Sequence, residues 1–142
     1  RTMHKRLRNE RGAAMIEAAV IIPLVMLVSV AIFEFGRAYQ HSQVITNAAR
    51  EGARVAVLEA YTDDQVRTIV RNYMTGGSLT NAGAASINIT RNVPFMSNTA
   101  SRVTVDYPFQ FMLLNPIARM VRGDSSLGTP LTMHSTALMR NE

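Results

Sequence analysis

The feature that most constrains this chain is an unbroken apolar run near its N-terminus. Of the 21 residues from Ala13 to Phe33, only Glu17 and Ser29 have polar side chains. As a helix with a rise of about 1.5 Å per residue, the run is about 31 Å long, which matches the hydrocarbon core of a bilayer. The pattern predicts a single-pass transmembrane helix over residues 13–35.

Positive charge is concentrated just ahead of this run. Residues 1–12 hold five basic side chains and one acid, so they carry +4 of the net charge of +5. Basic residues favour the cytoplasmic side, which predicts a cytoplasmic basic leader (1–12) and an extracytoplasmic domain (36–142). Residues 13–142 are nearly neutral, with ten arginines and nine acids. Without a basic cluster interleaved with aromatic residues, we expect no nucleic-acid partner.

The helical pattern continues beyond the apolar run but becomes amphipathic, which predicts one helix from about Gly12 to about Ala60. Its apolar stripe is made of small residues, which let a second backbone approach closely. We call these residues the small-residue stripe: Ala48, Ala49, Gly52, Ala53 and Ala56. Two alternatives are open at this stage, because the stripe packs either on the chain's own domain or on partner subunits.

A second, shorter helix is predicted after residue 61. Thr62 is a suitable N-cap, and Gln65 three residues later completes a capping box. Gly76–Gly77 ends the helix. Its expected buried face is formed by Val66, Ile69, Val70 and Tyr73.

The C-terminal half has the period of two that is typical of strands. Apolar residues alternate around 87–89, 103–111 and 131–139. A short helix with Asn115 as its N-cap is expected between the last two strands, running to Arg122 and stopping at Gly123. The fold class is therefore α+β: a long N-terminal helix, a second short helix, and a three-stranded antiparallel sheet packed on the long helix by one face.

The residues that enzymes and metal sites require are sparse. The chain has no cysteine, which excludes disulfides and cysteine-ligated metals. His4, His41 and His134 fall in three separate segments without metal-ligand spacing. Neither a nucleophile elbow nor a phosphate-binding loop is present. We expect no enzyme, no cofactor and no metal.

The basic leader ends in Gly12, the apolar helix begins at Ala13, and Glu17 is the fifth residue of that helix. This arrangement resembles the processing site of type IV prepilins, where a prepilin peptidase cuts after a glycine and the mature chain keeps its hydrophobic helix. A longer stretch, residues 11–58, resembles the TadE-like family of minor pilins (pseudopilins) in tight-adherence type IVb pilus systems. Its most specific part is "NAAREGARVAVL" (47–58).

The resemblance implies a minor pilin that takes part in assembly or initiation of a tight-adherence pilus. The implied location is the bacterial inner membrane, and the resemblance also allows incorporation into a surface pilus. The implied partners are the prepilin peptidase, other pseudopilins or the major pilin, the inner-membrane assembly machinery and membrane lipid. Cleavage is expected between Gly12 and Ala13.

Glu17 has a physical role under this interpretation. Cleavage gives Ala13 a free α-amine, whose ordinary pKa of about 8 leaves it positive at neutral pH. When subunits stack with a stagger, Glu17 of one subunit meets this amine of its neighbour, which offsets the burial of charge and fixes the register. The alternative is that Glu17, about 6 Å of helix rise from Ala13, only marks the membrane interface.

Two other interpretations fit the leader and the apolar run. One is an uncleaved single-pass anchor that carries an extracytoplasmic binding module. The other is a secreted protein cut after Ala31, since Ser29-Val30-Ala31 follows the small-x-small rule. The mature N-terminus separates the three interpretations: Ala13, an intact leader, or Ile32.

Overall fold

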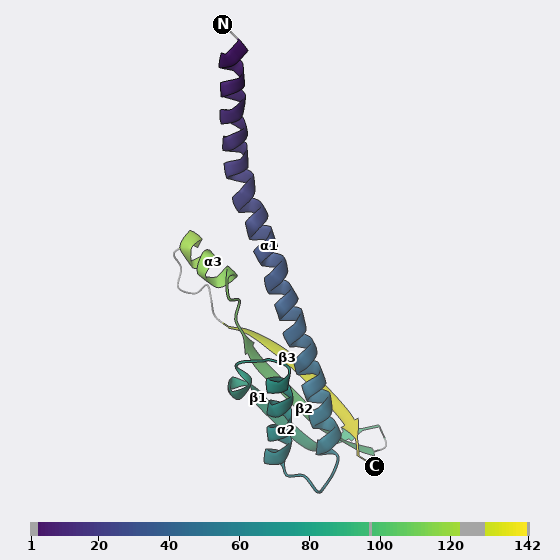
Figure 1. Cartoon of the computed structure of the whole chain (residues 1–142). Coiled ribbons are helices and arrows are strands. Elements are labelled where there is room, and N and C mark those ends of the chain that lie inside the picture. Colours follow the sequence, from purple (N-terminus) through teal and green to yellow (C-terminus); the bar gives the residue numbers. More distant parts are fainter. Residues whose placement is uncertain (1–2, 97, 123–129, 142) are drawn as a thin grey trace.

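A computed structural model of the chain describes residues 3–96, 98–122 and 130–141. One long helix runs through the molecule, and the other elements gather around its C-terminal half while its N-terminal half projects alone (Figure 1). The predicted α+β class is confirmed. In order, the elements are α1 (Met3–Ala56), α2 (Asp63–Gly76), the 3₁₀ turn η1 (Ala82–Ala84), β1 (Ser86–Phe95), β2 (Asn98–Phe109), α3 (Leu114–Arg122) and β3 (Leu131–Arg140).

The long helix is displaced from its expected bounds at both ends. It begins at Met3 rather than at Gly12, because one glycine within a helix costs only about 1 kcal/mol relative to alanine. It ends at Ala56 rather than near Ala60. There the last turn tightens, with the N–H of Leu58 bonded to the carbonyl of Val55 at 3.0 Å. α1 therefore passes without a break through both predicted segment boundaries, 12/13 and 35/36.

α2 begins as its sequence predicts. The hydroxyl of Thr62 accepts the N–H of Gln65, and the N–H of Thr62 donates to the side chain of Gln65 at 2.9 Å, which completes the capping box. One prediction for this helix is wrong: Tyr73 is 44% exposed, and Met74 is buried instead. The buried face follows a spacing of four through Val66, Val70 and Met74, which places Tyr73 toward solvent.

The sheet is an antiparallel meander in the order β1-β2-β3, with β2 in the centre. Its register pairs Ile87 with Val105 and Val103 with Ala137. β2 ends at Phe109, two residues before the expected Phe111. Pairing stops there because β3 begins at Leu131, the partner of Phe109.

α3 begins at Leu114, one residue before the expected N-cap Asn115, and extends to Arg122 as predicted. The predicted stop at Gly123 lies outside the described residues. In Figure 1, α3 is set apart from the sheet and lies toward the N-terminal half of α1.

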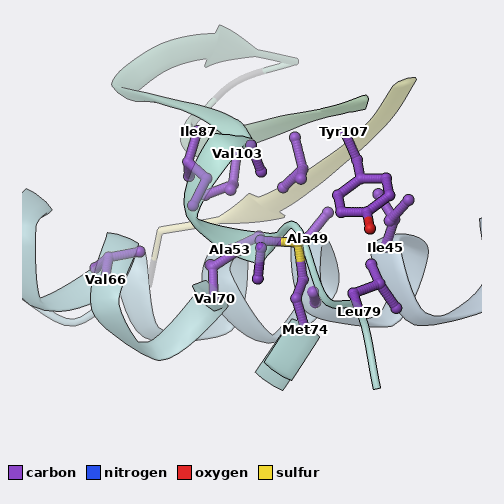
Figure 2. Packing of buried hydrophobic residues seen from close by; sticks show 14 of the residues in the cluster. Ile45, Ala49, Ala53, Val66, Val70, Met74, Leu79, Ile87, Val103 and Tyr107 are labelled. Atoms are coloured by element: carbon purple, nitrogen blue, oxygen red, sulfur yellow. The ribbon is translucent and has the colours of Figure 1, made fainter. Parts of the chain in front are cut away.

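The core lies between the second half of α1, α2 and one face of the sheet. Figure 2 shows side chains of α1 and α2 meeting those of β1 and β2. Alternating residues of β2 point into it, as period two requires. Its largest fully buried side chains include Tyr107, Phe109, Ile45, Met74, Leu79, Val66, Val70, Val103 and Val105.

Candidate functional site

Residues 12–29 of α1 are covered by no other described part of the protein. Every residue from Gly12 to Ser29 is exposed, including Met15 at 74% and Val20 at 68%. In the described part of the chain, α1 is the one helix long and apolar enough to cross a membrane. Apolar surface of this extent is rare on a soluble monomer, so the helix is consistent with a single-pass membrane protein.

The predicted processing residues lie on this uncovered half. Gly12 and Ala13 are exposed, and outside the adjoining helix no described atom lies within 4 Å of where a Cβ on Gly12 would be. Glu17 is also exposed, and it has no hydrogen bond or ion pair with any residue whose side chain is described. Cleavage after Gly12 and charge pairing by Glu17 stay predictions.

The small-residue stripe lies on the opposite half of the helix and is fully buried within the chain's own domain. Ala48 and Ala49 are 0% exposed, and Ala53 and Ala56 are 1% exposed. A Cβ added to Gly52 would lie 2.5 Å from Cγ2 of Val70 on α2 and 3.2 Å from Cγ1 of Val103 on β2. The stripe thus lets α2 and the sheet approach α1 more closely than larger side chains would allow. It packs on its own fold, the first of the two alternatives.

A glutamate that the sequence analysis did not single out is placed where the apolar run ends. Glu34 is completely buried. Its two carboxylate oxygens accept the N–H of Met112 at 3.0 and 3.1 Å, and one of them accepts the N–H of Leu113 at 3.0 Å. Hydrogen bonds from backbone N–H groups to a carboxylate are among the stronger ones in proteins. They tie α1 to the connection between β2 and α3.

Arg37, one turn further along α1, completes this attachment. Its guanidinium pairs with Glu34 Oε2 at 3.1 Å and donates to the carbonyl oxygen of Gln110 at 2.6 Å. The same group lies over the ring of Phe109, 4.9 Å from the centroid. We call Glu34, Arg37 and the backbone of residues 110–113 the helix clamp. It holds the end of β2 against α1 at the predicted membrane boundary.

A cleft of about 520 Å³ lies beside the helix clamp. Arg37 and His41 line it from α1, Phe109 from β2, and Arg119 from α3. His41 is buried, with ring centroids 5.2 Å from Phe109 and 5.8 Å from Tyr107. Burial, together with the positive charge of Arg37, lowers the pKa of His41 below its ordinary value.

Among the described residues, no group of three His, Asp or Glu side chains is placed to hold a metal ion. His41 is buried among aromatic rings. His134 is an exposed residue of β3 that lies 2.5 Å from a carboxylate oxygen of Asp106. The two histidines therefore serve separate parts of the fold.

Arg91 is a third charged residue that the sequence analysis missed. It lies where the register of β1 shifts between Thr90 and Val93. Its guanidinium donates to the carbonyl of Ala56 at 2.8 Å, to the carbonyl of Tyr61 at 2.7 Å and to Asp63 at 2.8 Å. Arg91 thereby caps the C-terminal end of α1.

The signals for these three residues were of unequal strength. Glu34 and Arg37 stand three apart just after the apolar run, a spacing that favours a helical ion pair. Their backbone partners are more than 70 residues away in sequence, and nothing local marks them. Arg91 has no local signal at all, because its role depends on an irregularity in the strand.

Comparison with known proteins agrees with the geometry of α1. Residues 12–54 match the family model described as TadE-like protein. The matched segment begins at the predicted cleavage glycine and includes Glu17, the apolar run, the helix clamp residues of α1 and most of the small-residue stripe. No curated protein and no solved structure gives a significant match. The chain therefore carries a TadE-like segment at residues 12–54, which confirms the resemblance seen in its sequence.

Proposed function

We propose that this protein is a minor pilin (pseudopilin) that takes part in assembly or initiation of a tight-adherence pilus. A prepilin peptidase cuts it between Gly12 and Ala13, and it is held in the bacterial inner membrane with residues 36–142 outside. The observation that carries the proposal is the TadE-like match over residues 12–54, because it covers the leader glycine, Glu17 and the uncovered apolar helix together.

The uncovered half of α1 can serve both the membrane-bound subunit and the assembled subunit. In the membrane its exposed apolar side chains face lipid. In an assembly the same side chains pack against the helices of other pseudopilins or the major pilin, so one surface exchanges lipid for protein. The folded domain need not open for this exchange, because its own core uses the other half of the helix.

Glu17 supplies the register in this scheme. It is free of partners among the side chains that the structure describes, and it lies one helical turn beyond the new N-terminus at Ala13. Pairing with the α-amine of a neighbouring subunit offsets the burial of both charges. A subunit displaced along the helix axis loses this pairing, which is how one charge can select one stagger.

The test is the mature N-terminus of the full chain, coexpressed with a prepilin peptidase and measured by intact mass. We expect the wild type to lose residues 1–12. Gly12→Leu should keep its leader, because the bulky side chain does not fit a site that selects glycine. Gly36→Leu is the matched control on the same helix, since a Cβ there also meets no atom within 4 Å. It should be processed normally.

Two results would contradict the proposal. An intact leader in the wild-type chain would favour the uncleaved anchored module. Cleavage that starts the chain at Ile32 would favour a secreted protein.

A further inference from the structure

The helix clamp fixes how deep α3 lies relative to the predicted membrane segment. Glu34 follows the last residue of the apolar run, Phe33, and its carboxylate holds the N–H groups of Met112 and Leu113. Residues 112–113 are therefore level with the end of the spanning segment. α3 starts at the next residue and contacts α1, and in Figure 1 it lies toward the N-terminal half of that helix.

Apolar side chains are exposed at this level. Met112 is 64% exposed, Leu113 is 43% exposed, and Met120 on α3 is 87% exposed. Phe35 of α1 is 62% exposed and has its ring 6.0 Å from that of Phe111, which places it beside the same segment. We call Phe35, Met112, Leu113, Arg119 and Met120 the membrane-edge surface. Phe35 lies just beyond the exposed apolar run, which ends at Phe33.

The charge of α3 is positive. The sequence of α3 has two arginines and no acidic residue. The cleft between α1 and α3 is lined by Arg37, whose charge is paired with Glu34, and by Arg119, and no carboxylate is among its described lining residues. A short segment with apolar side chains and arginines is the composition that binds in the headgroup region of an anionic bilayer.

We propose that the membrane-edge surface is a second membrane contact, which lies in the headgroup layer on the domain side of the bilayer that α1 spans. Its occupant is an anionic phospholipid surface. Met112, Leu113 and Met120 enter the boundary of the acyl chains, and Arg119 binds lipid phosphate. The contact sets the tilt and rotation of the domain on the membrane before assembly, because a spanning helix alone leaves rotation about its own axis free.

The experiment uses the absence of cysteine from the chain, which makes single-site labelling clean. The full chain is reconstituted as one copy per nanodisc, with an environment-sensitive fluorophore on Met120→Cys. Met96→Cys is the matched control, because Met96 is an exposed methionine (94%) that directly follows β1, at the opposite end of the sheet from Phe109. Val25→Cys reports whether α1 is inserted. Accessibility is measured by quenching with aqueous iodide and with headgroup spin-labelled lipid.

In discs that contain phosphatidylglycerol, we expect the Met120 label to be several-fold less quenched by iodide than the Met96 label. It should also be strongly quenched by the spin-labelled lipid. In discs of phosphatidylcholine alone, or with Arg119→Gln, the protection of Met120 should fall toward that of Met96. The Val25 label should stay protected from iodide in every disc.

Three results would overturn the proposal. The first is a Met120 label as open to iodide as the Met96 label while the Val25 label is protected. The second is equal protection of Met120 in both lipids, which would remove the anionic surface as the occupant. The third is protection that arises only when a second copy or another pilin is added, which would make this surface a protein interface. A Val25 label accessible to iodide would also count against the proposal, because it would show that α1 does not span the bilayer on which the contact depends.

Discussion

Between residues 12 and 29 of α1 the side chains face no other described part of the protein, whereas further along the helix one face forms a wall of the core. One glutamate in each half illustrates the contrast. Glu17 is exposed and has no partner among the described side chains, while Glu34 is completely buried and accepts N–H groups of Met112 and Leu113. Two glutamates seventeen residues apart on one helix thus have opposite surroundings.

This difference separates the residues that the chain needs for folding from those that can contact lipid or other subunits. Residues that contact α2 and the sheet cannot contact a second subunit without opening the core. The small-residue stripe is therefore committed to the chain's own fold. The exposed apolar side chains of the first half of α1 are free to exchange contact with lipid for contact with protein. Changes in the second half should alter stability, and changes in the first half should alter membrane behaviour and assembly.

The largest effect on stability is expected from Gly52→Leu. A Cβ at this position already lies 2.5 Å from Val70 and 3.2 Å from Val103, so four added carbons must displace α2 or β2. Overpacking of this kind costs about 1–3 kcal/mol, and a site without space should fall at the upper end. The gain from replacing glycine in a helix, about 1 kcal/mol, offsets only part of it. Chemical denaturation of the full chain in detergent measures the change.

Gly36→Leu is the control that ties this effect to packing rather than to helix propensity. Both glycines lie in α1, but nothing lies within 4 Å of a Cβ on Gly36. This variant should be as stable as the wild type or slightly more stable. Equal stability of the two variants would break the contrast between the two halves of α1.

The next largest effect is expected from Glu34→Ala. The substitution removes the acceptor of the N–H groups of Met112 and Leu113. It also leaves the guanidinium of Arg37 without its carboxylate partner. A buried donor without a partner costs about 1–3 kcal/mol, and these N–H groups are only partly buried, so the cost should lie toward the lower end. We expect the midpoint of denaturation to fall, and hydrogen exchange at Met112 and Leu113 to become faster.

Glu34→Gln separates the hydrogen bonds from the charge. Glutamine keeps one carbonyl oxygen as an acceptor for these N–H groups but loses the charge that pairs with Arg37. The stability of Glu34→Gln should therefore lie between that of the wild type and that of Glu34→Ala. Unchanged exchange at residues 112–113 in both variants would show that Glu34 does not hold this connection.

A smaller, pH-dependent effect is expected at His41. Burial and the charge of Arg37 lower its pKa, so the unfolded chain binds this proton more readily than the folded one. The contribution of neutral His41 to the free energy of unfolding is therefore present above the ordinary pKa of about 6.5 and is lost as the pH falls below it. The free energy of unfolding should decrease between about pH 8 and about pH 5.5.

His41→Phe tests that assignment, because phenylalanine keeps an aromatic ring between Tyr107 and Phe109 but has no proton to bind. Its stability should change less over the same interval than that of the wild type. An identical pH dependence in the two proteins would assign the titration to another group.

Most of the fold could be predicted because its determinants are local or periodic. The apolar run, the Thr62–Gln65 capping box and the alternation in β2 each act over a few residues, and each formed as expected. Tyr73 was misassigned because helical periodicity alone does not distinguish positions 73 and 74. The packing of Met74 against the other elements decides between them.

The candidate sites divide in the same way. Gly12, Ala13 and Glu17 are recognised from their order in the chain, so the sequence was enough to propose their roles. The helix clamp could not be found, because Glu34 binds backbone groups of residues 112 and 113, and a backbone N–H has no signature in a sequence. Arg91 depends on a register shift in β1, which no short pattern marks.

The smallest effect on stability is expected from Glu17→Ala, although its effect on assembly should be large. Glu17 has no partner in the described part of the subunit, so the free energy of unfolding should stay within about 0.5 kcal/mol of wild type. Insertion should be intact or easier, since an apolar residue costs less in lipid. Piliation, or capture of other pseudopilins, should fall because the α-amine of the neighbouring Ala13 loses its counter-charge. Glu17→Lys should be worse, since it places two cations together.

Glu59→Ala, which removes an exposed glutamate beyond the end of α1, should leave assembly unchanged. Normal assembly in both Glu17 variants would leave this residue as a marker of the membrane interface only.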